Sequence, residues 1–90
     1  MNICFEKMKE LDTILTNNNV PHDFYEWDTN GYKIDFDWSL GDIVCNKYTF
    51  FECESYNCPW DRDDVTRCSS KEMGKKITKW YYNLKRERIH

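Results

Sequence analysis

The chain has 90 residues, of which 40% are hydrophobic and 17% aromatic, a size that suits one domain spanning residues 1–90. It is too short for two domains or for an enzyme with a separate lid. The net charge of -3 is unevenly distributed. The segment from His22 to Asp64 is acidic, with eleven acidic and three basic residues, and the segment from Lys71 onward is basic. This polarity disfavours binding of nucleic acid or a membrane by the surface as a whole.

The N-terminal segment is predicted to form a helix over residues 3–16. Apolar residues there repeat at steps of four, three and four: Cys4, Met8, Leu11 and Leu15. The asparagines at 17–19 tolerate a left-handed conformation, and Pro21 prevents the helix from continuing. We therefore expect the chain to turn here and to become extended.

The middle of the chain is predicted to form strands near residues 22–27, 32–38, 43–46 and 49–56. Asn30 and Gly31 favour a type I′ hairpin turn after the first strand. The second strand has the clearest pattern, because apolar residues alternate with charged ones: Tyr32, Ile34, Phe36 and Trp38 with Lys33, Asp35 and Asp37. Short gaps between strands favour antiparallel pairing.

The C-terminal part is predicted to be a loop at 57–67 followed by a helix at 70–88. Ser69 and Glu72 match the capping box that begins a helix. The helix has an apolar stripe and a lysine-rich outer face. The predicted fold class is therefore α+β: an N-terminal helix, a three- to four-stranded antiparallel β-meander and a C-terminal helix.

Five cysteines without close pairing are typical of free thiols in a reducing compartment, and the charged N-terminus lacks the apolar run of a signal peptide. Zinc is the alternative reading. Cys53 and Cys58 have loose ligand spacing, and Cys45 and Cys68 would complete a tetrahedral site. The sequence leaves zinc open but favours scattered thiols, and we predict no metal and no cofactor.

No motif for catalysis is evident in the sequence. His22 and His90 have no nucleophile nearby in the chain, and no nucleophile elbow, phosphate loop or zincin motif occurs. Asp35 and Asp37 share one strand face and could hold a divalent metal, although acids on a wet face are usually only solvated. We therefore predict no catalytic residues and no enzymatic activity.

The acidic segment is the strongest indication of function, because a surface of one sign accelerates encounter with a basic partner. The alternative is that these acids only keep the protein soluble and protect the strand edges. We predict a partner-binding surface that includes Trp60 as an apolar anchor. Its charged members are Asp28, Asp35, Asp37, Asp61, Asp63 and Asp64.

Several segments resemble a family of small proteins encoded by phages and other mobile elements of Gram-positive, often gut, bacteria. These are Asn-Asn-x-Val-Pro-His at the end of the first helix, Gly-Tyr-Lys-Ile-Asp-Phe-Asp-Trp at 31–38, Gly-Asp-Ile-Val-Cys-Asn at 41–46, and Asp-Asp-Val at 63–65. The resemblance implies action in the cytoplasm of a bacterial host cell, and by analogy inhibition of host defence, as by anti-CRISPR proteins.

Our first hypothesis is that the protein is a non-enzymatic inhibitor that covers the basic, nucleic-acid-binding surface of a defence protein such as a CRISPR nuclease. Two other hypotheses are considered beside it. The alternative is a small regulatory module that binds nucleic acid or a nucleotide through the basic C-terminal helix. A third is a ligand sponge with a pocket at an oligomer interface. The acidic majority of the chain disfavours nucleic acid, no membrane partner is expected, and the oligomeric state stays open.

Overall fold

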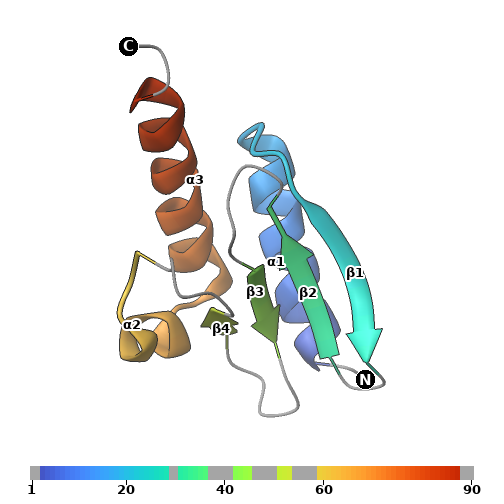
Figure 1. Ribbon diagram of the computed structural model, residues 1–90. Coiled ribbons are helices and arrows are strands. Elements are labelled where there is room, and N and C mark those ends of the chain that lie inside the picture. The colour runs from blue at the N-terminus through green and yellow to red at the C-terminus, as the bar shows by residue number, and fades with distance from the viewer. Residues whose placement is uncertain (1–2, 29–30, 37–41, 46–50, 54–58, 88–90) are drawn as a thin grey trace.

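A computed structural model describes residues 3–28, 31–36, 42–45, 51–53 and 59–87 (Figure 1). Helices lie at both ends of the chain and an antiparallel sheet lies between them, so the predicted α+β class is confirmed. Within the described ranges, none of the helices has the length and apolar character that a bilayer crossing requires. In chain order the elements are α1 (Ile3–Asn17), β1 (Asp23–Asp28), β2 (Gly31–Asp35), β3 (Asp42–Cys45), β4 (Phe51–Cys53), α2 (Arg62–Arg67) and α3 (Ser70–Glu87).

The end of α1 is closed by the asparagine tract, as the sequence predicts. Asn19 has a φ of 59°, the left-handed conformation that asparagine tolerates. The Val20 amide donates to the Leu15 carbonyl at 2.9 Å, and the Asn19 amide donates to the Thr16 carbonyl at 3.1 Å. This pair of bonds is a Schellman motif, and the burial of both Leu15 and Val20 supplies its usual apolar contact. The chain leaves α1 in a fixed direction toward β1.

The sheet has the strand order β1-β2-β3-β4, with antiparallel neighbours throughout. Ile34 of β2 is fully buried and pairs with Phe24 of β1, which packs against the core, so these two residues share the inner face. Lys33 and Asp35 occupy the opposite, outer face and are half-buried. The predicted alternation of β2 is therefore confirmed over its described part, while residues 37 and 38 lie outside the described ranges.

β1 and β3 have the predicted lengths and are shifted by one residue, whereas the described parts of β2 and β4 are shorter than the predicted strands. The chain reverses at the predicted turn segment 28–31, because Asp28 and Gly31 pair across it, whereas residues 29 and 30 lie outside the described residues. Phe36 follows β2 and is buried without being part of a strand. The remaining ends of the predicted strands lie in the ranges 46–50 and 54–56, which are also outside the described residues.

Two helices and one face of the sheet form the core. Helix α1 packs against β2 and β3, and α3 runs parallel beside α1 (Figure 1). The Ser70 hydroxyl donates to the Lys7 carbonyl at 3.0 Å at one end, and the Tyr82 hydroxyl donates to the Asn18 carbonyl at 2.8 Å at the other. The buried apolar residues are Met8, Leu11, Leu15, Val20, Ile34, Phe36, Phe51, Val65, Cys68, Met73 and Ile77.

The predicted loop at 57–67 is wrong in its second half, because α2 occupies residues 62–67 and packs against β4. Asp63 and Asp64 lie in the first turn and Arg67 in the last, a charge order that complements the helix dipole. Buried Val65 anchors this short helix to the core. A single apolar residue gives no periodic signal, which is why the sequence pattern does not reveal α2.

Helix α3 begins at the predicted capping box. The Glu72 amide donates to the Ser69 hydroxyl at 3.2 Å, and the Ser69 amide donates to the Glu72 carboxylate at 3.3 Å. Both donors would otherwise be unpaired at the start of the helix. The reciprocal pair confirms the prediction and fixes where the lysine-rich face of α3 begins.

Candidate functional site

The predicted partner-binding acids lie on separate parts of the fold. Asp35 lies on β2, two strands away from β4, whereas Asp61, Asp63 and Asp64 lie at and within α2 beside β4. Asp28 ends β1, but its side chain lies outside what the structure describes, as does the whole of Asp37. The acids whose side chains are described therefore form two groups, one on the sheet and one on α2.

The acids described on the sheet include two aspartates on neighbouring strands. Asp35 of β2 pairs in register with Asp23 of β1. Since Ile34 faces the core, this pair belongs to the outer face. Like charges directly opposite each other on neighbouring strands are destabilising. Among the side chains that the structure describes, no three acidic, histidine or cysteine groups converge as a metal site.

The acids of α2 are the more accessible group. Asp61, Asp63 and Asp64 are all exposed, and none forms an ion pair with another described residue. Asp61 occupies the N-cap position, where its carbonyl accepts from the Val65 amide at 3.1 Å, but its side chain makes no capping hydrogen bond. Three carboxylates within four residues thus face solvent on one short helix.

Trp60 directly precedes Asp61 and packs toward α3. Its ring is half-buried and contacts the Trp80 ring edge to face, with centroids 5.1 Å apart and planes at 76°. Trp80 in turn meets buried Phe36 at 6.1 Å. The two tryptophans therefore extend the core outward between the start of α2 and the middle of α3.

A cleft of about 410 Å³ lies against these two rings, and it is basic rather than acidic. None of the described residues that line it is an acid. Lys75, Lys76 and Lys79 supply three ammonium groups, and none of them forms an ion pair with another described residue. We call this the lysine–tryptophan cleft, and its principal lining residues are Trp60, Lys75, Lys76, Lys79, Trp80 and Asn83.

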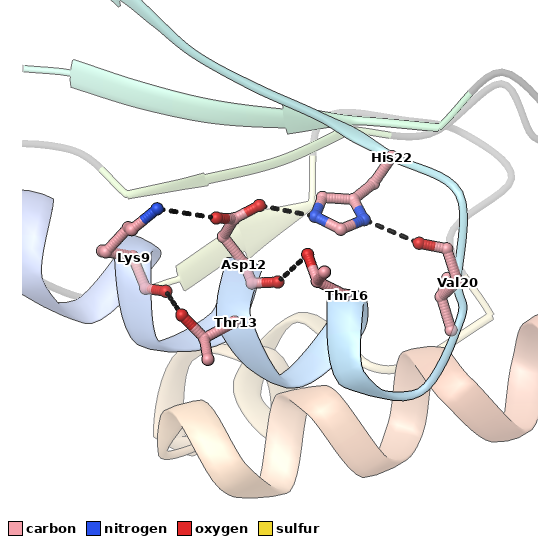
Figure 2. A network of polar contacts seen from close by, with 6 residues as sticks. All are labelled: Lys9, Asp12, Thr13, Thr16, Val20 and His22. Atoms are coloured by element: carbon pink, nitrogen blue, oxygen red, sulfur yellow. Dashed lines mark hydrogen bonds and ion pairs between the residues drawn. The ribbon is translucent and has the colours of Figure 1, made fainter.

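The described histidine, His22, lies in a polar network between α1 and the start of β1 (Figure 2). Its Nδ1 lies 2.7 Å from the Val20 carbonyl oxygen and its Nε2 lies 2.6 Å from an Asp12 carboxylate oxygen. A carbonyl oxygen only accepts, so Nδ1 carries a proton and donates it. Lys9 contacts the other Asp12 oxygen at 3.2 Å.

This network holds the turn after α1 rather than offering a reactive group. Both ring nitrogens of His22 are engaged, and only 6% of its side chain is exposed. A general base or a metal ligand needs one nitrogen free to meet substrate or metal. His22 therefore ties α1 to the start of β1 in this structure.

Cys68 is the predicted zinc ligand whose side chain the structure describes, and it is buried. Its thiol donates to the Asp64 carbonyl at 3.1 Å. Burial raises the pKa of the Cys68 thiol, while the nearby Lys76 ammonium lowers it. Cys58 and the side chains of Cys45 and Cys53 lie outside the described residues. Cys68 itself acts here as a small core residue.

Two features of the site escape sequence reasoning. Asp12 is the partner of His22, and nothing in the spacing of ten residues reveals that pairing. The lysine–tryptophan cleft combines α3 with Trp60 from the preceding segment, so it exists only in the folded chain. Part of its signal is present in the sequence, because Lys75, Lys79 and Asn83 recur at four-residue steps along one side of a helix.

Comparison of this chain with known protein families, with curated proteins and with solved structures gives no match. The resemblance to small phage and mobile-element proteins therefore stays a prediction. Two described surfaces of opposite charge have the chemistry to bind a partner or a ligand: the acidic one on α2 and the basic cleft on α3.

Proposed function

We propose that this protein is a non-enzymatic inhibitor of a bacterial defence protein, and that it binds a basic, nucleic-acid-binding surface through the acids of α2. One observation carries the proposal: Asp61, Asp63 and Asp64 are exposed together without an ion-pair partner among the described residues. The aspartates of the sheet lie elsewhere, so we assign the contact to α2.

The electrostatics of α2 suit contact with a surface that ordinarily holds phosphates. Carboxylates that are not neutralised within the protein keep their full charge for a partner, and a local field of one sign steers encounter. Helix α2 lies at a corner of the molecule beside the first turn of α3 (Figure 1). A corner position lets a short acidic helix enter a groove without the rest of the fold obstructing it.

The described histidine ring and the described cysteine thiol are both engaged within the fold. The ring of His22 is held by Asp12 and Val20, and the thiol of Cys68 is buried against the Asp64 carbonyl. Neither group is presented to an incoming substrate. Binding through charge requires neither of them.

The first experiment recovers the partner and then tests the surface. Tagged protein is used to capture binding proteins from a Gram-positive host that carries active defence systems, and mass spectrometry identifies what is bound in stoichiometric amount. We expect a defence nuclease, whose binding and cleavage of target DNA are then measured with increasing amounts of this protein. Inhibition should weaken as salt rises, because exposed charges are screened.

Matched variants then separate α2 from overall charge. The triple variant Asp61→Asn/Asp63→Asn/Asp64→Asn should bind the nuclease about three- to one-hundredfold more weakly, since each exposed ion pair contributes about 0.2–1 kcal/mol. Asparagine also preserves the N-cap position. The control, Glu6→Gln/Glu10→Gln/Asp23→Asn, removes the same charge from exposed positions on α1 and β1. Equal affinity of the two variants would contradict the assignment to α2.

A further inference from the structure

The lysine–tryptophan cleft is separate from the acids of α2 and has the opposite charge. Its size, about 410 Å³, lies within the range of small-molecule sites, which is about 300–1,000 Å³. It combines two indole rings with three ammonium groups on one stretch of α3. These lysines form no ion pair with another described residue, so their charges are available to an anionic ligand.

The rings and the charges are arranged for a ligand that is both planar and anionic. Trp60 and Trp80 meet edge to face at 76°, so their contact covers one face of one ring only, whereas a parallel stack would cover a face of each. Both rings are half-buried, which holds them in place while leaving part of each accessible. Lys75 and Lys79 are exposed and one helical turn apart, and Lys76 lies beside them half-buried.

We propose that the lysine–tryptophan cleft binds a nucleotide, with the base against the indole of Trp60 and the phosphate between Lys75 and Lys79. Aromatic side chains stack with any base because every base has a π-face, and lysine binds phosphate as a point charge. The nucleotide is either free or one unit of a single strand. The site is independent of the acidic contact that we propose for α2.

The neighbouring acids argue for this ligand over a second copy of the chain. An acidic α2 from another molecule would also complement the lysines. However, Asp61 directly follows Trp60, so a second α2 entering the cleft would bring its own carboxylates close to those of the first. A single phosphate brings less negative charge to this place than three carboxylates.

The test uses the full-length reduced protein and two sets of probes. Binding of AMP, ADP and ATP is measured by calorimetry, and binding of fluorescein-labelled single-stranded DNA and RNA of about twelve nucleotides by anisotropy. Saturable binding of a mononucleotide supports the site with a free ligand. Saturable binding of an oligonucleotide alone supports it with a nucleic-acid ligand. For an oligonucleotide with one phosphate held between the two lysines, the logarithm of the affinity should fall with the logarithm of salt with a slope of about -0.7.

Two lysine pairs on α3 provide matched variants. Lys75→Glu/Lys79→Glu should reduce affinity about tenfold or more, whereas Lys71→Glu/Lys85→Glu makes the same charge change outside the cleft and should alter it less than about threefold. Trp60→Leu should weaken binding about five- to one-hundredfold through lost stacking. Circular dichroism confirms that each variant is folded.

Three results would overturn the proposal. The first is that no mononucleotide or oligonucleotide binds saturably. The second is an equal loss in the two lysine pairs, which would show attraction by the whole helix rather than by the cleft. The third is concentration-dependent dimerisation that disappears in both Lys75→Glu/Lys79→Glu and Asp61→Asn/Asp63→Asn/Asp64→Asn, which would assign the cleft to a second copy.

Discussion

Gly74 marks the closest approach of α1 and α3, and substituting it tests the packing of the two helices. A Cβ atom added at Gly74 would lie 2.5 Å from the Cγ2 methyl of Ile14 and 3.3 Å from its Cβ. The methyl is on a β-branched side chain whose χ1 has one strongly preferred value in a helix, so it does not swing away easily. Gly74→Ala therefore forces the helices or the Ile14 side chain to move.

The magnitude follows from two opposing effects. Alanine in a helix interior is favoured over glycine by about 1 kcal/mol. Overpacking typically costs about 1–3 kcal/mol. We expect Gly74→Ala to lower the free energy of unfolding by about 1 kcal/mol, which for a domain of this size lowers the Tm by about 4–8 °C. Urea denaturation followed by circular dichroism, under reducing conditions, measures this change.

A double-mutant cycle isolates the clash. In an Ile14→Ala background the Cγ2 methyl is gone, so Gly74→Ala should no longer destabilise and should show a coupling of about 1–2 kcal/mol with Ile14. Asn83→Ala on the exposed face of α3 is the control, and it should stabilise by several tenths of a kcal/mol through helix propensity alone. Stabilisation by Gly74→Ala in the native background would refute the close packing of α1 on α3.

Three more predictions concern the described polar groups. Asp12→Ala should lower the free energy of unfolding by about 1.5–3 kcal/mol, because it removes the carboxylate that His22 contacts. Lys9→Ala, the control, should change the free energy of unfolding by less than about 1 kcal/mol. Equal losses of stability in urea denaturation would contradict this prediction. Ser69→Ala should cost about 1 kcal/mol by removing the cap of α3, seen as a lower Tm, and an unchanged Tm would argue against the capping box. Because burial raises its pKa, the Cys68 thiol should react with iodoacetamide at neutral pH far more slowly in the folded than in the urea-unfolded protein, and its reaction should become faster as pH rises. Peptide mapping by mass spectrometry measures the labelling of this residue alone. Rapid labelling of Cys68 in the folded protein would contradict its burial.

The acidic and basic segments of the sequence are brought close together in the fold, which their order along the chain does not reveal. Helix α2 carries exposed acids, and the cleft on α3 carries exposed lysines, although the two helices are separated by only two residues. The two proposed surfaces therefore lie close together without neutralising each other through ion pairs among the described residues. A ligand in the cleft and a partner on α2 would be neighbours.

The sequence by itself determines the elements whose signals are local. The apolar steps in α1, the asparagine tract that closes it, the alternation along β2 and the capping box of α3 each act between residues a few positions apart. Patterns of this kind predict the α+β class and the order of helices and sheet. They fail for α2, whose one buried residue, Val65, gives no period.

Only the tertiary structure decides which side chains meet across the chain. The pairing of His22 with Asp12 depends on where the turn after α1 places the start of β1. This contact gives His22 a structural role that the sequence alone does not reveal. The position of Trp60 against Trp80 depends on how α2 packs against β4. That packing places Trp60 at a basic cleft that local spacing does not reveal, because contacts between distant residues follow from burial of the whole core.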